Sequence, residues 1–130
     1  MKSGVIASAF DLLHAGHCVM LKNARSYCDH LTVLLHTDPS KERENKNTPS
    51  QSTTERFIQL ESCKYVDYII PYDTENDLVN ILSSYSFDVR FLGEEYQNQP
   101  ITGEHLVPIC FLSRKHNWSS SELRERIKTS

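Results

Sequence analysis

The sequence predicts a single-domain α/β fold built on a parallel sheet, and three observations support this. Short, continuous apolar runs alternate along the chain with segments in which apolar residues recur at helical spacing. Runs without polar alternation are typical of strands covered on both faces, as in parallel sheets. The length of 130 residues, with 38% hydrophobic and 24% charged residues, suits one globular domain with a substantial core.

Each apolar run predicts one strand, and a helix is expected after most of them. The first helix follows the first strand and places His17, Leu21 and Cys28 on one face. Capping boxes, in which a Ser or Thr and an acidic residue three positions later cap each other's backbone, predict the starts of three more helices. The expected strands are Val5–Phe10, Leu31–His36, Val66–Ile70, Val89–Leu92 and Ile109–Leu112, and the boxes are Ser52–Glu55, Thr74–Asp77 and Ser119–Glu122.

Two polar loops separate these elements, Asp38–Gln51 and Glu94–Glu104. A loop as long as the first is either a solvated surface segment or a lid that carries ligand-binding residues. Ligands bind open parallel sheets beyond the carboxyl ends of the strands, where the strand order reverses. A site is therefore expected among the residues that follow the first, fourth and fifth strands.

Charge, hydropathy and cysteine content exclude several classes of protein. The formal net charge of −3 offers no basic excess for nucleic acid, and no apolar stretch approaches the roughly 20 residues that span a bilayer. We therefore expect no nucleic-acid partner and no membrane association. The four cysteines form no C-x-x-C pair, which favours core packing in a reducing, cytoplasmic compartment.

The segment after the first strand predicts a phosphate site. With only four glycines, the chain cannot form either of the common glycine-rich phosphate-binding fingerprints. Instead, His14 and His17 flank Gly16 where the first helix begins. The free N–H groups and positive dipole end of a helix attract anions, glycine permits close approach, and the imidazoles add hydrogen-bond donors.

This H-A-G-H segment resembles the H-x-G-H signature of the cytidylyltransferase-like nucleotidyltransferases. The resemblance extends in order from residue 4 to about residue 127. The compact length is most similar to the glycerol-3-phosphate cytidylyltransferases within that family. Further matching segments are Phe10–His14 (FDLLH), Thr54–Arg56 (TER), Lys64–Asp67 (KYVD), Leu92–Glu95 (LGEE), and Arg114 with Trp118–Ser121 (WSSS).

The resemblance implies a Rossmann-like doubly wound sheet of strand order 3-2-1-4-5, a homodimer, and nucleotidyl transfer. A phosphate monoester, with glycerol 3-phosphate as the first candidate, would attack the α-phosphate of CTP, accompanied by Mg²⁺. Positioning and charge stabilisation would suffice, because a phosphate monoester is mostly dianionic at neutral pH. The implied catalytic residues are His14, His17, Lys46 and Arg114; the nucleotide contacts are Ala9, Phe10, Gly16, Gly93, Glu94, Ser119, Ser120 and Ser121; the acceptor contacts are Asp11 and Arg56; no metal ligand is implied.

Simpler interpretations remain open for several of these residues. Asp11, His14 and His17 have the spacing of a small metal site. Lys46 could be a solvated surface lysine, Arg56 the partner of a neighbouring turn, and the triple serine only a helix cap. For the whole chain, the alternatives are ATP as donor, an acceptor such as phosphocholine, phosphoethanolamine or a sugar phosphate, a nucleotide-binding module without turnover, and a metal-binding or scaffold protein.

The chain departs from the family pattern at several positions, among them Glu94 for the usual aspartate and Asn117 for a glycine, and two further departures bear on the substrates. Ser8 and Ala9 stand where the family has glycine and threonine, so we expect a reshaped nucleotide pocket. The segment Tyr72–Tyr85 lacks the lysines that glycerol-3-phosphate cytidylyltransferases carry there. A phosphate acceptor therefore has to be held by other residues, or it is a different phosphate.

Overall fold

The computed structural model, which describes residues 1–114 and 120–129, contains one five-stranded sheet of order β3-β2-β1-β4-β5. All four strand pairs are parallel, which confirms the predicted fold class and strand order. The order reverses between β1 and β4, which are hydrogen-bonded neighbours although two strands separate them in sequence. The strands are β1 (Ser3–Ser8), β2 (His30–His36), β3 (Tyr68–Tyr72), β4 (Val89–Gly93) and β5 (Ile109–Leu112).

Two strands, β1 and β3, are displaced from their predicted positions at both ends, whereas β2 and β4 are only slightly longer than predicted. The strand β1 ends at Ser8, so Ala9 and Phe10 belong to the turn that follows it. The strand β3 begins at Tyr68, because the residues before it form a turn in which Val66 N–H donates to the Cys63 carbonyl. Apolar side chains in both turns pack against the core, which explains why they resemble strand residues in the sequence.

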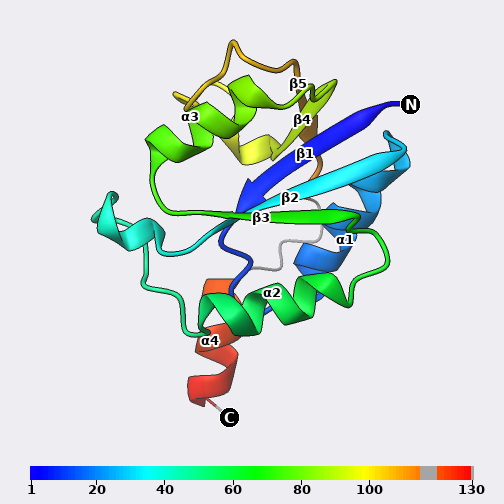
Figure 1. The fold of residues 1–130 in the computed structure, drawn as a ribbon. Helices are drawn as coiled ribbons and strands as arrows, with labels where there is room; N and C mark the ends of the chain where they lie inside the picture. The colour runs from blue at the N-terminus through cyan, green and yellow to red at the C-terminus, as the bar shows by residue number, and fades with distance from the viewer. Residues whose placement is uncertain (115–119, 130) are drawn as a thin grey trace.

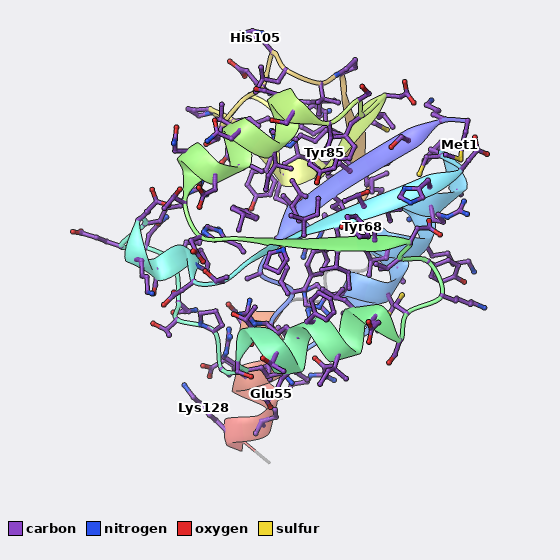
Figure 2. The ribbon with its side chains drawn as sticks, viewed as in Figure 1. Met1, Glu55, Tyr68, Tyr85, His105 and Lys128 are labelled. Carbon is purple, nitrogen blue, oxygen red and sulfur yellow. The ribbon has the colours of Figure 1, made fainter. Side chains whose placement is uncertain are left out.

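The helices are α1 (Ala15–Ser26), α2 (Thr53–Glu61), α3 (Glu75–Ser84) and α4 (Ser120–Thr129), with short 3₁₀ turns at η1 (Pro39–Lys41) and η2 (Glu94–Tyr96). The capping boxes at Ser52–Glu55 and Thr74–Asp77 form as predicted. In Figure 2, Glu55 marks the start of α2. The third predicted box begins at Ser119, which lies outside the described residues.

Helices cover both faces of the sheet (Figure 1), with α1 and α2 on one face and α3 on the other. Alternate residues of β2 supply both cores, since Val33 and Leu35 pack on the α1 face whereas Leu34 packs on the α3 face. On the α3 face, Leu34 packs with Leu78 and Leu82 of the helix. Burial on both faces accounts for the continuous apolar runs in the sequence. None of the helices in the described part of the chain combines the length and apolar character needed to cross a membrane.

Candidate active site

A pocket of about 570 Å³ lies at the carboxyl ends of β1 and β4, where the strand order reverses. Its volume is in the range of small-molecule sites, and its place follows the general rule for open parallel sheets. The parallel arrangement brings residues that are far apart in sequence to one edge of the sheet. Of the residues expected from the sequence, the pocket is lined by Ala9, Phe10, Asp11, His14, Gly16, His17, Lys46, Gly93 and Arg114.

His14 and His17 cap the first helix as well as line the pocket. The Nδ1 atom of His14 accepts from Gly16 N–H at 3.0 Å, and Nδ1 of His17 accepts from His14 N–H at 3.3 Å. They form a capping box in which two imidazoles replace the usual Ser and Glu. Their rings stack with centroids 3.9 Å apart. Because both Nδ1 atoms accept, each neutral ring carries its proton on Nε2 and has that N–H as its donor.

The turn before the histidines has a constrained backbone. Phe10 and Leu12 have φ angles of 49° and 52°, which side-chain-bearing residues rarely adopt. The Phe10 side chain is buried in the core, and its ring lies 5.4 Å from that of His17. Leu12 N–H donates to Gln51 Oε1 at 2.9 Å, so the end of the long loop holds the turn in place.

Asp11 connects three segments in the wall of the pocket. The residue is only 6% exposed, and its carboxylate accepts from the backbone N–H groups of Ser50 at 2.8 Å and Gln51 at 2.9 Å. It also forms an ion pair with Arg124 of α4. Burial raises the pKa of Asp11, but the two backbone hydrogen bonds and the Arg124 charge outweigh it and hold the pKa below the usual 3.8. These contacts make Asp11 an anchor for the loop and for α4.

Arg56 is a buried structural residue in this fold. It is 1% exposed and does not line the pocket. Its Nη atoms donate to the carbonyls of Ala9, His36 and Thr37 at 2.6–2.9 Å, and the remaining N–H groups reach Gln51, Ser52 and Thr53. With all five N–H donors in use, Arg56 has none left for an acceptor phosphate. The geometry therefore does not support the direct acceptor contact expected from the sequence.

The two acidic residues after β4 contact different groups of Arg114, and only one of the two lines the pocket. Glu94 Oε1 accepts from Arg114 N–H at 3.0 Å, and Glu94 is not among the residues that line the pocket. Glu95, which the sequence analysis did not select, lines the pocket and pairs with Arg114 Nη1 at 2.7 Å. A Cβ atom at Gly93 would collide with the Glu95 carboxylate, so glycine allows this carboxylate to reach Arg114.

The remaining predicted site residues lie on the long loop and on α4. Lys46 lines the pocket and is partly buried, whereas Glu44, Asn45, Asn47 and Thr48 around it are exposed. Ser121 is exposed on α4 and does not line the pocket. Ser119 and the Ser120 side chain lie outside the part of the chain that the structure describes.

A group of polar residues that the sequence analysis did not select lines the α3 side of the pocket. We call Arg43, Glu75 and Arg90 the α3-side cluster; His36 and Tyr72 lie beside it. The Tyr72 and His36 rings stack at 4.5 Å, and burial lowers the pKa of His36 and raises that of Tyr72. The sequence feature that could have identified this cluster is Arg90, a charged residue within an otherwise apolar strand.

The described residues contain no group of three or more His, Cys, Asp or Glu side chains arranged to hold a metal ion. Asp11, His14 and His17 are all described, so the structure does not assemble the small metal site that their spacing allows. Carboxylates that line the pocket are engaged by arginines, Glu75 by Arg43 and Glu95 by Arg114. A magnesium ion here would depend on phosphate oxygens of a ligand for most of its coordination.

Residues 5–126 match the family model described as cytidylyltransferase-like. The bifunctional protein HldE of Caulobacter sp. (strain K31) is 34% identical over 108 residues, which are 82% of this chain and 22% of that protein. The glycerol-3-phosphate cytidylyltransferase of Staphylococcus aureus (strain NCTC 8325 / PS 47) is 26% identical over 127 residues, 98% of this chain and 96% of that enzyme. The chain thus spans about a fifth of the HldE protein and almost all of the second relative.

Solved structures share the fold. The lipopolysaccharide core biosynthesis protein from Thermoplasma volcanium GSS1 has a TM-score of 0.64 at 24% identity, over 99% of this chain and 88% of that chain. Pantothenate synthetase from Thermus thermophilus has a TM-score of 0.62 at 12% identity, over 97% of this chain and 64% of that chain. At such identities the likeness concerns the fold alone.

Proposed function

The chain belongs to the cytidylyltransferase-like family and is a nucleotidyltransferase, and we propose that it transfers CMP from CTP to a small phosphate monoester. An oxygen of the acceptor phosphate forms a bond to the α-phosphorus of CTP. The bond from that phosphorus to the bridging oxygen breaks, and pyrophosphate leaves. The acceptor needs no deprotonation by the protein, because a phosphate monoester is largely dianionic at neutral pH.

One observation carries this proposal, the pair of pocket-lining histidines at the start of α1. Both rings accept backbone N–H groups at Nδ1, so the donor of each neutral ring is Nε2–H, which we assign to phosphate oxygens. Because the capping box fixes the rings before substrate binds, their donors need little rearrangement as charge develops on the α-phosphate. The helix N-terminus adds its own positive end to the same place.

Other cations would hold the rest of the triphosphate. Lys46 lines the pocket from the long loop, and Arg114, which follows β5, lines it while paired with Glu95. Gly16, Ala9 and the backbone of Phe10 form the wall against which the nucleotide would lie. Magnesium, when bound with the triphosphate, would neutralise charge on the leaving pyrophosphate, as in phosphoryl-transfer enzymes generally.

The choice of substrates rests on the relatives. The S. aureus relative is a glycerol-3-phosphate cytidylyltransferase and aligns with nearly the whole chain, which supports CTP and glycerol 3-phosphate as substrates and CDP-glycerol as product. We also expect a homodimer in the cytoplasm. The family resemblance supports the dimer, and the four cysteines, which are unpaired in the fold, support a reducing compartment.

Pyrophosphate release tests the proposal directly. Each of the four nucleoside triphosphates would be offered with Mg²⁺ and a panel of monoesters: glycerol 3-phosphate, phosphocholine, phosphoethanolamine and sugar phosphates. We expect release with CTP and at least one acceptor. Release with ATP alone would show that ATP, and not CTP, is the nucleotide donor. If no acceptor in the panel gives pyrophosphate release but CTP still raises the melting temperature of the protein, a nucleotide-binding module without turnover would be favoured.

A further inference from the structure

The α3-side cluster holds two charged groups with unused hydrogen-bonding capacity. Arg90 projects from β4 and is only 4% exposed; its Nη1 donates to the Thr102 carbonyl at 2.6 Å, while its buried Nε has no partner among the described residues. Glu75 Oε1 pairs with Arg43 Nη2 at 2.6 Å, and its buried Oε2 likewise has no partner in the described part of the chain. Leaving such groups unsatisfied is unfavourable, so their retention in a pocket wall points to a ligand.

The position of the cluster separates it from the expected nucleotide contacts. Arg90 and Glu75 line the α3 side of the pocket, and α3 packs on the face of the sheet opposite to α1 (Figure 1). His14, Gly16 and Arg114, which we assign to the triphosphate, lie at the start of α1 and after β5. The two substrates of a transfer reaction must meet at the α-phosphate, so the α3 side remains for the acceptor.

We propose that the α3-side cluster binds the hydroxyl groups of a polyhydroxylated acceptor, a polyol phosphate or sugar phosphate, and so determines acceptor specificity. This inference rests on the proposed transfer reaction. A hydroxyl group both accepts and donates, so a vicinal pair of hydroxyls satisfies an unused arginine N–H and an unused carboxylate oxygen together. A quaternary ammonium or ammonium head group would instead meet two guanidinium groups against one carboxylate.

The cluster also explains how the chain manages without lysines in Tyr72–Tyr85. Arg90 and Arg43 supply positive charge at the same side of the pocket from β4 and from the long loop. Charge supplied by arginines that are already held by Thr102 and Glu75 is directional, whereas a lysine side chain acts as a mobile point charge. Directional donors suit the uncharged hydroxyl groups of the acceptor phosphate.

Direct binding provides the test, with glycerol 3-phosphate and propyl phosphate as a matched pair that differs in two hydroxyl groups. Calorimetry would measure the affinity of this pair, and also of glucose 1-phosphate and phosphocholine, for the protein in the presence of Mg²⁺ and a non-hydrolysable CTP analogue. We expect the hydroxylated ligands to bind at least about tenfold more tightly than propyl phosphate, the range for hydrogen bonds to charged groups. In Glu75→Ala and Arg90→Gln the ratio of the two affinities, glycerol 3-phosphate to propyl phosphate, should fall toward one. The affinity for the CTP analogue should stay unchanged. Glu61→Ala, an exposed glutamate on α2, is the control variant.

Several results would overturn the inference while leaving the transfer reaction intact. One is equal affinity for glycerol 3-phosphate and propyl phosphate, and another is tightest binding of phosphocholine. A third is weaker binding of the CTP analogue by Glu75→Ala, which would assign the cluster to the nucleobase. If Arg90→Gln fails to fold, the inference is still tested by Glu75→Ala and by comparing glycerol 3-phosphate with propyl phosphate on the wild-type protein. Pyrophosphate release, measured separately, reports on the transfer reaction itself.

Discussion

Asp11 and Arg124 form an ion pair across 113 positions of the sequence, and this pair ties the last helix to the turn after the first strand. The Asp11 side chain is 7% exposed and that of Arg124 is 23% exposed, so water screens the pair only partly. Arg124 also donates from Nε to Ser50 Oγ at 3.3 Å. Through these contacts the β1–α1 turn, the end of the long loop and α4 hold one wall of the pocket.

Removing one partner of this pair should destabilise the protein. Asp11→Asn leaves Arg124 without its counter-charge and weakens two backbone contacts, so we expect a loss of about 2–3 kcal/mol in the free energy of unfolding. Urea denaturation would measure it. Arg126→Gln on the same helix is the control; the side chain of Arg126 is 62% exposed and pairs with Glu122, so its loss should change stability by less than about 0.5 kcal/mol. Equal effects of the two variants would contradict the role of the buried pair.

The same pair predicts a component of acid sensitivity. The pKa of Asp11 is lower in the folded protein than the usual 3.8, so its contribution to stability is complete above that value and is lost as the pH falls through the lower, folded pKa. In Asp11→Asn, this part of the pH dependence should disappear. The free energy of unfolding, measured for both proteins from pH 7 to pH 2, should differ by a constant amount above about pH 5 and converge below about pH 4. A constant difference down to pH 2 would be inconsistent with it.

His14 and His17 each have a capping role and a proposed catalytic role, and substitution can separate the two. His14→Ala and His17→Ala should each lower turnover by about 10²-fold or more, the usual effect of losing a transition-state donor. Loss of the cap should also reduce stability by about 1 kcal/mol. His14→Asn retains an N-cap acceptor, so it should recover the stability without the turnover. Wild-type turnover in both alanine variants would refute the mechanism.

His36 predicts a loss of stability on mild acidification. Burial lowers its pKa below the usual 6.5, so the unfolded chain takes up a proton before the folded protein does. Stability should therefore be complete above pH 6.5 and decline as the pH falls below it, with a slope of at most about 1.4 kcal/mol per pH unit. His36→Gln should flatten this slope between pH 7 and pH 5. Leu34→Ala, a core variant without a titratable group, should lower stability by the same amount at every pH.

Arg56 offers a test of a structural against a substrate-binding role. Arg56→Ala should lose at least about 3 kcal/mol, because it leaves several buried carbonyls without a donor. Arg56→Lys keeps the charge but not the planar arrangement of donors, and should retain a folded fraction. In that fraction we expect an unchanged KM for the acceptor. A selective rise in the KM for the acceptor, with wild-type stability, would instead indicate that Arg56 contacts the acceptor.

Much of the fold and part of the candidate site were predictable from local patterns. The capping boxes at Ser52 and Thr74 involve contacts three residues apart, so they form wherever the helix starts. The pocket-lining position of His14, Gly16 and His17 followed from a short motif beside a strand end. The shifted ends of β1 and β3 show where local patterns fail, since buried turn residues are as apolar as strand residues.

The sequence by itself therefore determined the α/β class, the strand order through its resemblance to a known family, and the histidine pair at the start of α1. Only the tertiary structure decided that Arg56 and Asp11 hold loops together, and that Glu95 rather than Glu94 faces the pocket with Arg114. It also brought Arg90 and Glu75 to one wall. The physical reason is range. Periodicity and capping depend on neighbours a few positions away, whereas the partner of a buried charge is chosen by how distant segments pack.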